Sequence, residues 1–428
     1  MARFKFLILI GFVVGIFVFL GFRFIAPRIF QNSNETVGVV GRYNTYGLPT
    51  PILSTIGMGL TVLDKSGQPT PGIAKTWEGS DSGKTWIFHL RQDLHWQDGT
   101  NVVSDDINYN FQDADVQRPD KYTIIFKLGS SFAPFPVTVA RPVFKKGLLG
   151  TGQWKVVNLS LAGEYVETLT LQDSSNDQRV YKFYPTEERA KLAYELGEVR
   201  KIQDLIDDKP FETWTNTKVT KNVNKQRYVA VFFNTKDDFL KDKDVRQALT
   251  YAIDKDSLSA DREYGPISSN SWAYNPSLKH YDLDPAKAKG LIDKSQLSPE
   301  QKANLKIKLT TTPELLSTAD KIIKDWKNIG IDATLQVTSF LPDQYQAFLG
   351  IYDIPLDPDQ YMTWHSSQTQ TNITRYDNPR ISKLLEDGRL ETNPEKRKGV
   401  YLDFQRFLVE DTPAAFLFYP TYFTIERK

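Results

Sequence analysis

Cysteine is absent from the 428-residue sequence. This absence excludes disulfide bonds, thiolate zinc sites, iron–sulfur clusters and cysteine nucleophiles. Hydrophobic residues make up 40% of the chain and aromatic residues 13%, which is enough to bury a sizeable core without covalent cross-links. The missing cysteines therefore exclude several kinds of site, but they do not exclude a location outside the cytoplasm.

A surplus of charge of either sign is also missing. The chain carries 53 Lys and Arg against 52 Asp and Glu, for a net charge of +1. Four of the basic residues lie in the first 30 positions, which contain no acid, so the remainder carries 49 basic and 52 acidic residues, or −3. Because nucleic-acid binding needs clustered positive charge, the near-neutral body predicts no nucleic-acid partner.

The common catalytic signatures are absent or incomplete. There is no Gly-x-Ser-x-Gly elbow, and the four histidines are scattered without a His-Glu-x-x-His motif. Residues 79–85 (GSDSGKT) resemble a phosphate-binding loop, but the spacing is one residue short and a strand pattern follows. We expect a turn between two strands there, with Gly83 in the turn, and we predict neither a cofactor nor a metal site.

The first 30 residues predict a membrane segment. Residues 6–22 form an uncharged apolar run preceded by Arg3 and Lys5, and as a helix this run would span roughly 26 Å. A cleaved signal peptide is one interpretation, but Ala26 is the only small residue at a plausible cleavage point. We therefore expect an uncleaved anchor in the cell membrane, with the body extracytoplasmic, at the cell surface or in the periplasm.

The rest of the chain alternates between the two regular periodicities. Period-two patterns predict strands over residues 84–91, 121–128, 163–172 and 228–234. Helical periods predict helices over residues 244–253 and 395–410. The sequence thus indicates a mixed α/β protein.

Residues 306–338 form the clearest unit. Strands are predicted over 306–311 and 331–337, the second with Ile331, Ala333, Leu335 and Val337 on one face. The helix predicted between them, over 313–329, ends before Gly330, which suits a position with positive φ. This is a βαβ crossover, so we expect the two strands to be parallel.

The segment Asp357-Pro358-Asp359 leaves several interpretations open. It could form a metal–nucleotide site, an acid/base carboxylate pair or a ligand-binding loop. It could also form a bare turn, because Pro358 restricts Asp357 to extended geometry. We predict that Asp357 or Asp359 either faces a cationic group of a ligand or orders the loop.

Aromatic residues gather in two turn-rich loops. Trp272 and Tyr274 follow a Gly-Pro turn, and Tyr361, Trp364 and His365 follow the Asp-Pro-Asp turn. Such residues suit a cleft for a peptide or another amphipathic ligand, or else they pack on their own domain. The predicted ligand-binding set is Trp272, Tyr274, Asp357, Asp359, Tyr361, Trp364 and His365.

Several segments, in order, resemble the family 5 extracellular solute-binding proteins, the peptide- and nickel-binding subunits of ABC importers. They are residues 72–111 (GIAKTWEGSDSGKTWIFHLRQDLHWQDGTNVVSDDINYNF), 150–156 (GTGQWKV), 228–258 (YVAVFFNTKDDFLKDKDVRQALTYAIDKDSL), 265–274 (GPISSNSWAY) and 357–386 (DPDQYMTWHSSQTQTNITRYDNPRISKLLE). The resemblance covers most of residues 38–419.

The resemblance implies a fold and a division of the chain. It implies a type II periplasmic-binding-protein-like fold, with two α/β lobes around a ligand cleft. The extra domain should be reduced or missing, because only residues 107–120 lie between the expected helix start at Asp105 and Asp106 and the next strand, where relatives carry a long insertion. The expected divisions are 1–30 anchor or signal segment, 31–225 lobe I with the remnant of the extra domain, 226–400 lobe II, and 401–428 a C-terminal segment returning to lobe I.

The resemblance also implies a function without covalent chemistry. The protein would capture a peptide-like solute and deliver it to an ABC importer, with a small-molecule or short-peptide ligand, a membrane permease and the membrane as partners, and would act as a monomer. In peptide-binding relatives an aspartate before the Asp-Pro-Asp turn pairs with the ligand's amino group, and Asp353 is the nearest candidate here. A tethered sensor or scaffold of the same fold and an extracytoplasmic hydrolase are the alternatives.

Overall fold

The computed structural model describes residues 34–428. The anchor or signal segment predicted at residues 1–30 lies outside the described residues. Within 34–428, no helix combines the length and the apolar character needed to cross a bilayer. The described chain forms two compact units, one made of residues 34–48 and 153–203 with Arg427, the other of residues 49–152 and 204–426 with Lys428.

The first unit is built on a mixed sheet. Within this unit, the strand order of the sheet is β11-β1-β10-β9-β8. The elements are β1 (Asn34–Val40), β8 (Lys155–Ala162), β9 (Tyr165–Gln172), β10 (Gln178–Tyr184), α5 (Glu187–Glu195) and the start of β11 (Lys201–Leu205). Strand β1 pairs in parallel with both β10 and β11, and β9 runs antiparallel to β10 and β8. The strand predicted over 163–172 is therefore confirmed as β9.

The second unit begins with a four-stranded antiparallel sheet. Its order is β4-β5-β7-β6, beside the short pair β2-β3. The elements are α3 (Thr50–Ile56), β2 (Thr61–Leu63), β3 (Pro69–Pro71), β4 (Ala74–Ser80), β5 (Thr85–Leu90), β6 (Ala114–Asp120), β7 (Thr123–Leu128) and α4 (Phe135–Thr138). We call residues 49–152 the four-stranded subdomain. It has its own core, in which the rings of Phe88, Phe126 and Phe135 lie within 6.2 Å of one another.

Two predictions fall in this subdomain. Gly83 lies in the turn between β4 and β5 with φ +84°, as expected. The prediction that a helix starts at Asp105 and Asp106 was wrong. A single 3-10 turn, Ser104–Asp106, ends there, and Ile107 is extended. Asp106 accepts a hydrogen bond from the Trp96 indole at 2.9 Å, so this carboxylate fixes the turn rather than starting a helix.

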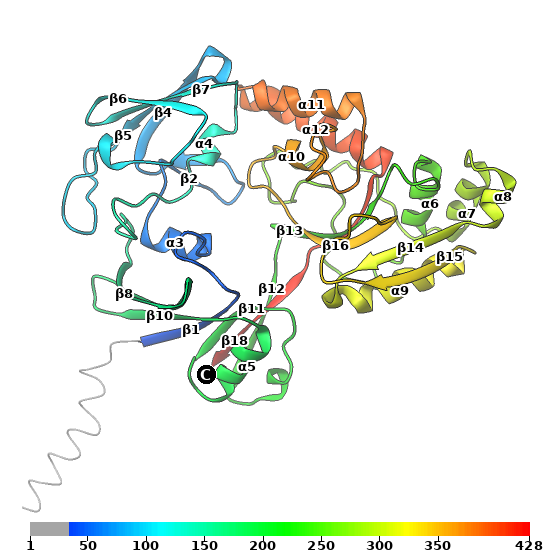
Figure 1. The fold of residues 1–428 in the computed structure, drawn as a ribbon, viewed down its shortest axis with the longest axis horizontal. Helices are drawn as coiled ribbons and strands as arrows, with labels where there is room; N and C mark the ends of the chain where they lie inside the picture. The colour runs from blue at the N-terminus through cyan, green and yellow to red at the C-terminus, as the bar shows by residue number, and fades with distance from the viewer. Residues whose placement is uncertain (1–33) are drawn as a thin grey trace, which may run out of the picture. The chain divides into compact units, whose positions relative to one another are not determined.

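A five-stranded sheet forms most of the rest of the second unit. Its order is β15-β14-β16-β13-β17, and we call residues 227–418 the five-stranded subdomain. Its strands are β13 (Arg227–Phe233), β14 (Lys306–Thr311), β15 (Asp332–Val337), β16 (Ala347–Asp353) and β17 (Ala414–Phe418). Its helices are α6 (Lys243–Ala252), α7 (Pro285–Lys294), α8 (Pro299–Ala303), α9 (Leu316–Asn328), α10 (Tyr361–Trp364), α11 (Pro379–Leu390) and α12 (Pro394–Asp411). Figure 1 shows α9 along β14 and β15, and α11 beside α12.

The predicted βαβ crossover is confirmed. Strands β14 and β15 pair in parallel, and Gly330 has φ +93° after α9. Helix α9 buries Ala319, Ile322 and Trp326 against the sheet. At the end of β15, which is an edge strand, Val337 is 46% exposed.

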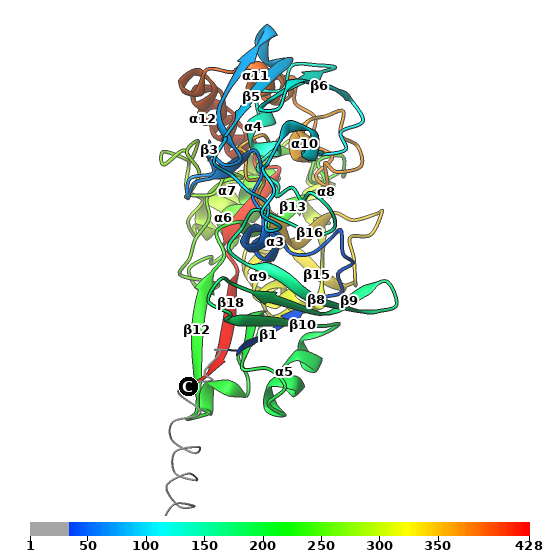
Figure 2. The same ribbon diagram turned by 90° about the vertical axis from the view of Figure 1, so that its left-hand side faces the viewer.

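The chain enters and leaves the five-stranded subdomain at adjacent points. Strand β12 (Thr217–Val223) leads into β13, and β17 leads into β18 (Thr421–Arg427). Figure 2 shows β12 and β18 side by side, and the Asn224 amide donates to the Pro420 carbonyl at 2.9 Å. The domain divisions predicted at residues 225 and 400 stay predictions.

Two glycines of the α11–α12 pair are expected to respond oppositely to alanine. Gly399 is exposed inside α12, and an added Cβ would meet no atom within 4 Å. Gly399→Ala should therefore raise the free energy of unfolding by about 0.5–1 kcal/mol, since alanine loses less backbone entropy in a helix. At Gly388 the added Cβ would lie 2.8 Å from the buried Tyr401 ring, so Gly388→Ala should lower it by about 1–3 kcal/mol. Urea denaturation measures both, and shifts of the same sign would contradict this packing.

Candidate functional site

A cavity of about 620 Å³ lies in the second unit. Its lining comes from both subdomains and from the connection between β12 and β13. The contributing segments are 50–58, 62–67 and 137–142 of the four-stranded subdomain, 225–226 of the connection, and 268–271 and 354–356 of the five-stranded subdomain. A volume of this size is typical of a site for a small organic ligand.

The turn between β2 and β3 closes one side of this cavity. The Trp272 amide donates to the Ser66 carbonyl at 3.1 Å, which joins the two subdomains by a backbone hydrogen bond. Gly67 has φ +84°, and a Cβ there would lie 2.7 Å from the Leu356 carbonyl oxygen. Only glycine permits this approach without displacing the facing chain.

Asp64 shapes the turn. Its Oδ1 accepts hydrogen bonds from the Ser66 amide at 2.8 Å, the Ser66 hydroxyl at 2.7 Å and the Gln68 amide at 3.0 Å. The Ser66 hydroxyl, with these amides, lowers the pKa of the Asp64 carboxyl. The carboxylate is thus already committed to the turn.

A second contact between the subdomains involves Arg389 and the predicted residue Asp359. The Ala133 amide donates to the Arg389 carbonyl at 2.7 Å, and the Arg389 guanidinium lies over the Phe132 ring at 5.5 Å. The same guanidinium pairs with Asp359 Oδ2 at 2.9 Å and lies 3.9 Å from the Tyr361 ring centre. Burial raises the pKa of the Asp359 carboxyl, which Arg389 opposes. Asp359 therefore holds the arginine that contacts the other subdomain.

Asp357 is buried and faces a cation of the protein itself. Its two carboxylate oxygens accept from the Arg397 guanidinium at 2.8 and 2.5 Å. Arg397 also donates to the Gly388 carbonyl at 2.8 Å and to the Tyr401 hydroxyl at 3.1 Å. The Asp357 charge raises the pKa of Arg397 despite its burial. This pair joins the loop before α10 to α11 and α12.

The aromatic members of the predicted set lie in the same neighbourhood. Trp272 and Tyr274 are half-buried, and Trp272 packs edge-on against Tyr401 at 6.4 Å. The Tyr361 ring stacks on His365 at 4.0 Å, and Trp364 is 1% exposed beside Phe416.

His365 is fully engaged. Its Nδ1 lies 2.7 Å from the Ser367 hydroxyl and its Nε2 lies 3.2 Å from Glu386.

Among the described residues that line the cavity, none belongs to the predicted set of seven, although Ser271 and Leu356 directly precede two of its members. Ligand contact by the seven stays a prediction.

Sequence reasoning missed the charged residues of the cavity. Lys65 lies in the β2–β3 turn, Arg141 follows α4, and Lys225 lies between β12 and β13. The turn composition Asp-Lys-Ser-Gly was a readable signal for the first. Nothing in the sequence brought the other two together, because they are 84 positions apart and only the fold joins them.

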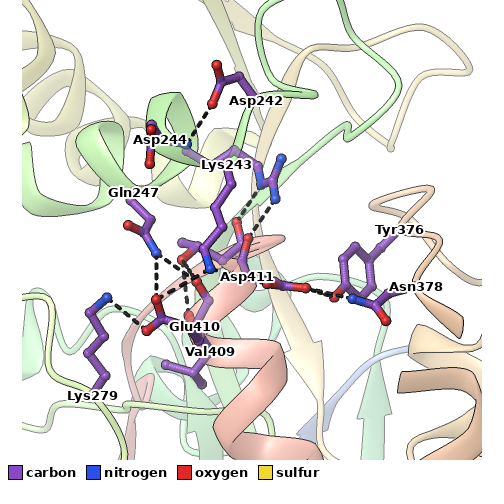
Figure 3. Close-up of polar contacts among 12 residues, drawn as sticks. Asp242, Lys243, Asp244, Gln247, Lys279, Tyr376, Asn378, Val409, Glu410 and Asp411 are labelled. Atoms are coloured by element: carbon purple, nitrogen blue, oxygen red, sulfur yellow. Dashed lines mark hydrogen bonds and ion pairs between the residues drawn. The ribbon is translucent and has the colours of Figure 1, made fainter. Parts of the chain in front are cut away.

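The Val-Arg-Gln-Ala segment of α6 contributes Arg246 and Gln247 to a polar cluster at the end of α12, which is drawn in Figure 3. Arg246 is buried and donates to the carbonyls of Asp411 at 2.6 Å and Thr412 at 3.0 Å, and Gln247 donates to the Glu410 carbonyl at 2.7 Å. These carbonyls have no partner within their own helix, so the side chains of α6 satisfy the end of α12. The role of this cluster is structural.

Metal-ligating side chains do not gather in the part of the chain that is described. Over residues 34–428, no group of three or more His, Asp or Glu side chains has the geometry to hold a metal ion. What the cavity offers to a ligand is therefore apolar surface, hydroxyls, backbone groups and three cations.

Comparisons with known proteins agree with this architecture. The oligopeptide-binding protein AppA of Bacillus subtilis is 22% identical, over 91% of this chain and 87% of its own. Among solved structures, NikZ of Campylobacter jejuni in complex with Ni(L-His) has a TM-score of 0.73 at 22% identity, over 93% of this chain and 94% of its own. The ABC transporter substrate-binding protein CtaP of Listeria monocytogenes has a TM-score of 0.76 at 20% identity, over 92% and 94%.

These likenesses establish the periplasmic-binding-protein-like fold that was predicted. The family itself is established by the sequence, because residues 68–372 match the profile described as bacterial extracellular solute-binding proteins, family 5 Middle. The reduction or loss of the extra domain stays a prediction. This chain belongs to the family 5 bacterial extracellular solute-binding proteins, a family of binding proteins rather than enzymes.

Proposed function

We propose that this protein captures a short peptide in the 620 Å³ cavity and delivers it to the permease of an ABC importer. One observation carries the proposal: both subdomains of a family 5 chain line a single ligand-sized cavity and meet through the Ser66–Trp272 hydrogen bond. Similar proteins are named for dipeptide and oligopeptide binding, and DppA of Helicobacter pylori was solved with the peptide STSA. No bond of the peptide changes, so the protein is a carrier and not an enzyme.

Capture works by population shift. A ligand that contacts both subdomains stabilises the arrangement in which they meet, and only its differential affinity drives that change. To raise the population of the closed arrangement from 1% to 99%, the ligand would have to prefer it by roughly 5.5 kcal/mol. Backbone pairing with an extended peptide and one desolvated charge contact can supply such a preference.

The seven predicted residues enter the proposal as the support of two loops. Asp357 and Asp359, each held by an arginine, order the segment that carries Leu356 to the cavity. Trp272 holds the β2–β3 turn through its amide. Of the two roles predicted for the aspartates, we therefore favour ordering of the loop over contact with a ligand cation.

The location and assembly state complete the proposal. The N-terminal segment anchors the protein in the cell membrane, and the body works as a monomer outside the cytoplasm, where family members act.

Filling the cavity should block peptide binding. Ser54 is an exposed residue of α3 that lines the cavity, and Ser54→Trp should weaken binding of tri- and tetrapeptides at least tenfold. Ser277→Trp is the matched control, because Ser277 is exposed away from the lining. Isothermal titration measures both variants. Unchanged affinity in Ser54→Trp would place the peptide site elsewhere, and no binding by the wild type would refute the proposal.

A further inference from the structure

One wall of the cavity is a segment that forms neither helix nor strand. It consists of residues 264–272, and we call it the wall segment. Three of its residues line the cavity, namely Ser268, Asn270 and Ser271. At its end, the Trp272 amide makes the hydrogen bond to Ser66 that joins the two subdomains. The position of the wall segment therefore affects both the shape of the cavity and the contact between the subdomains.

Ser269 lies between these lining residues and is held by two groups from outside the wall segment. Its amide donates to the hydroxyl of Tyr419, which follows β17, at 2.8 Å. Its hydroxyl accepts from the Lys225 ammonium at 3.2 Å. Lys225 Nζ also lies 5.7 Å from the centre of the Tyr419 ring. Tyr419 and Lys225 together therefore fix the middle of the wall segment.

Glu263 directly precedes the wall segment and is buried. Its Oε1 accepts from the Tyr264 and Gly265 amides, whereas its Oε2 has no hydrogen-bond partner among residues 34–428. Burial raises the pKa of this carboxyl to about 7, and both Tyr419 and Lys225 oppose that rise by favouring the ionised form. The two groups that hold Ser269 are thus groups that a charge on Glu263 attracts.

The other titratable groups near Glu263 have different partners. They face its carboxyl or share with it a second cavity of about 10 Å³, and they are Tyr228, Tyr264, Tyr274, Lys255, Arg262, Lys279 and Tyr281. Lys255 donates to backbone carbonyls, Arg262 pairs with Asp256, and Lys279 pairs with Glu410. In the described part of the chain, none of these three cations donates a hydrogen bond to the wall segment. Lys225 is therefore the cation that connects the charge of Glu263 to the cavity.

We infer that Glu263 is a positioning residue of the ligand site, and that the cavity binds its ligand more tightly while Glu263 carries a proton. A protonated Glu263 leaves Lys225 on Ser269, as in this structure. An ionised Glu263 would hold a buried charge on an oxygen without a partner, which is costly. We expect it to draw Lys225 away from Ser269 and to loosen the wall segment. The inference rests on the proposed function and adds a direction to it: solute is captured below about pH 7 and released above it.

Isothermal titration with the peptide Ala-Ala-Ala tests the inference. The affinity of the wild type, relative to that of Glu263→Gln, should fall about tenfold between pH 6 and pH 8, the change expected for one linked proton. Glutamine keeps an oxygen for the two amides but does not titrate, and the titration of the peptide itself cancels in the ratio. Glu300→Gln is the matched control, because Glu300 is exposed on α8 and does not line the cavity. This variant should keep the pH dependence of the wild type.

Hydrogen exchange of the Ser269 amide provides a measurement that needs no ligand. After correction for the intrinsic exchange rate, its protection in the wild type should fall roughly fivefold between pH 6 and pH 8 and stay constant in Glu263→Gln. Peptide binding with the same pH dependence in both proteins would overturn the inference and leave the proposed function standing. Loss of protection in the wild type alone, without any peptide binding, would support the role of Glu263 and overturn the peptide function. Constant protection together with no binding would overturn both.

Discussion

Replacing Arg397 with methionine is expected to lower the free energy of unfolding by about 3–5 kcal/mol. The side chains of Arg397 and Asp357 are each only 8% exposed. Removing the guanidinium leaves the Asp357 carboxylate buried without its partner, and the Gly388 carbonyl loses a donor as well. An unpaired buried charge costs more than the pair contributes, because the low-dielectric interior cannot replace the lost hydration.

Two companion variants make the reason for this loss visible. Arg406 lies on the same helix and pairs with Asp403 at the surface, where the side chains are 60% and 53% exposed, so Arg406→Met should change stability by less than about 1 kcal/mol. The double variant Arg397→Met, Asp357→Leu removes both charges and should recover much of the loss. Urea denaturation of the variants measures the differences. A double variant no more stable than Arg397→Met would show that packing, not the unpaired charge, accounts for the effect.

In the wild type, titration of Glu263 is expected to change the free energy of unfolding by about 3 kcal/mol with pH, and Glu263→Gln should remove this change. Glu263 is 1% exposed, and burial raises the pKa of its carboxyl from 4.5 to about 7, against opposing contacts from Tyr419 and the amides of Tyr264 and Gly265. The folded state thus keeps a proton that the unfolded chain releases above about pH 4.5. The stabilisation is fully present below that pH and is lost as the pH rises through about 7.

Glutamine keeps the amide contacts without titrating. Glu263 Oε1 accepts from the Tyr264 amide at 2.7 Å and the Gly265 amide at 3.1 Å, and the glutamine oxygen can take the same place. The free energies of unfolding of wild type and Glu263→Gln should therefore diverge between pH 4.5 and 7, with the variant gaining on the wild type as the pH rises. Parallel curves across this range would contradict a buried, protonated Glu263.

Lys255 contributes with the opposite sign and in another range. Burial lowers the pKa of its ammonium from 10.5 to about 7, and Nζ donates to the carbonyls of Thr250 and Tyr281, each at 2.5 Å. The unfolded chain binds a proton here between pH 7 and 10.5 that the folded state lacks, so stability rises with pH through that range. Together, the two groups should contribute least to the free energy of unfolding of the wild type near pH 7.

Periodicity and turn residues predicted those elements whose packing partners lie close by in the sequence. The crossover of β14, α9 and β15 was predicted because period two, period 3.6 and a glycine at positive φ occur within 33 consecutive residues. Turn chemistry likewise placed Gly83 between β4 and β5. The prediction of a helix start at Asp105 and Asp106 failed, because the 3-10 turn ends there and Ile107 is extended.

The charge partners of the two aspartates could not be predicted. Arg397 lies 40 positions from Asp357, and Arg389 lies 30 positions from Asp359. The Asp-Pro-Asp segment marked a loop that needs an explanation, but the choice between facing a ligand and facing an arginine depends on how α11 and α12 pack. No periodicity encodes that choice, since side chains far apart in the chain meet only through the fold.

By itself, the sequence determined the mixed α/β class, the family, the crossover unit and the positions of the loops, because these follow from residue order and local periodicity. Only the tertiary structure decided which side chains surround the cavity and which of its charges are neutralised. Arg141, Lys65 and Lys225 are three unrelated cations in the sequence, and they surround one cavity only because three distant segments converge on it. Electrostatic energy depends on distance in space, which the order of residues along the chain does not specify.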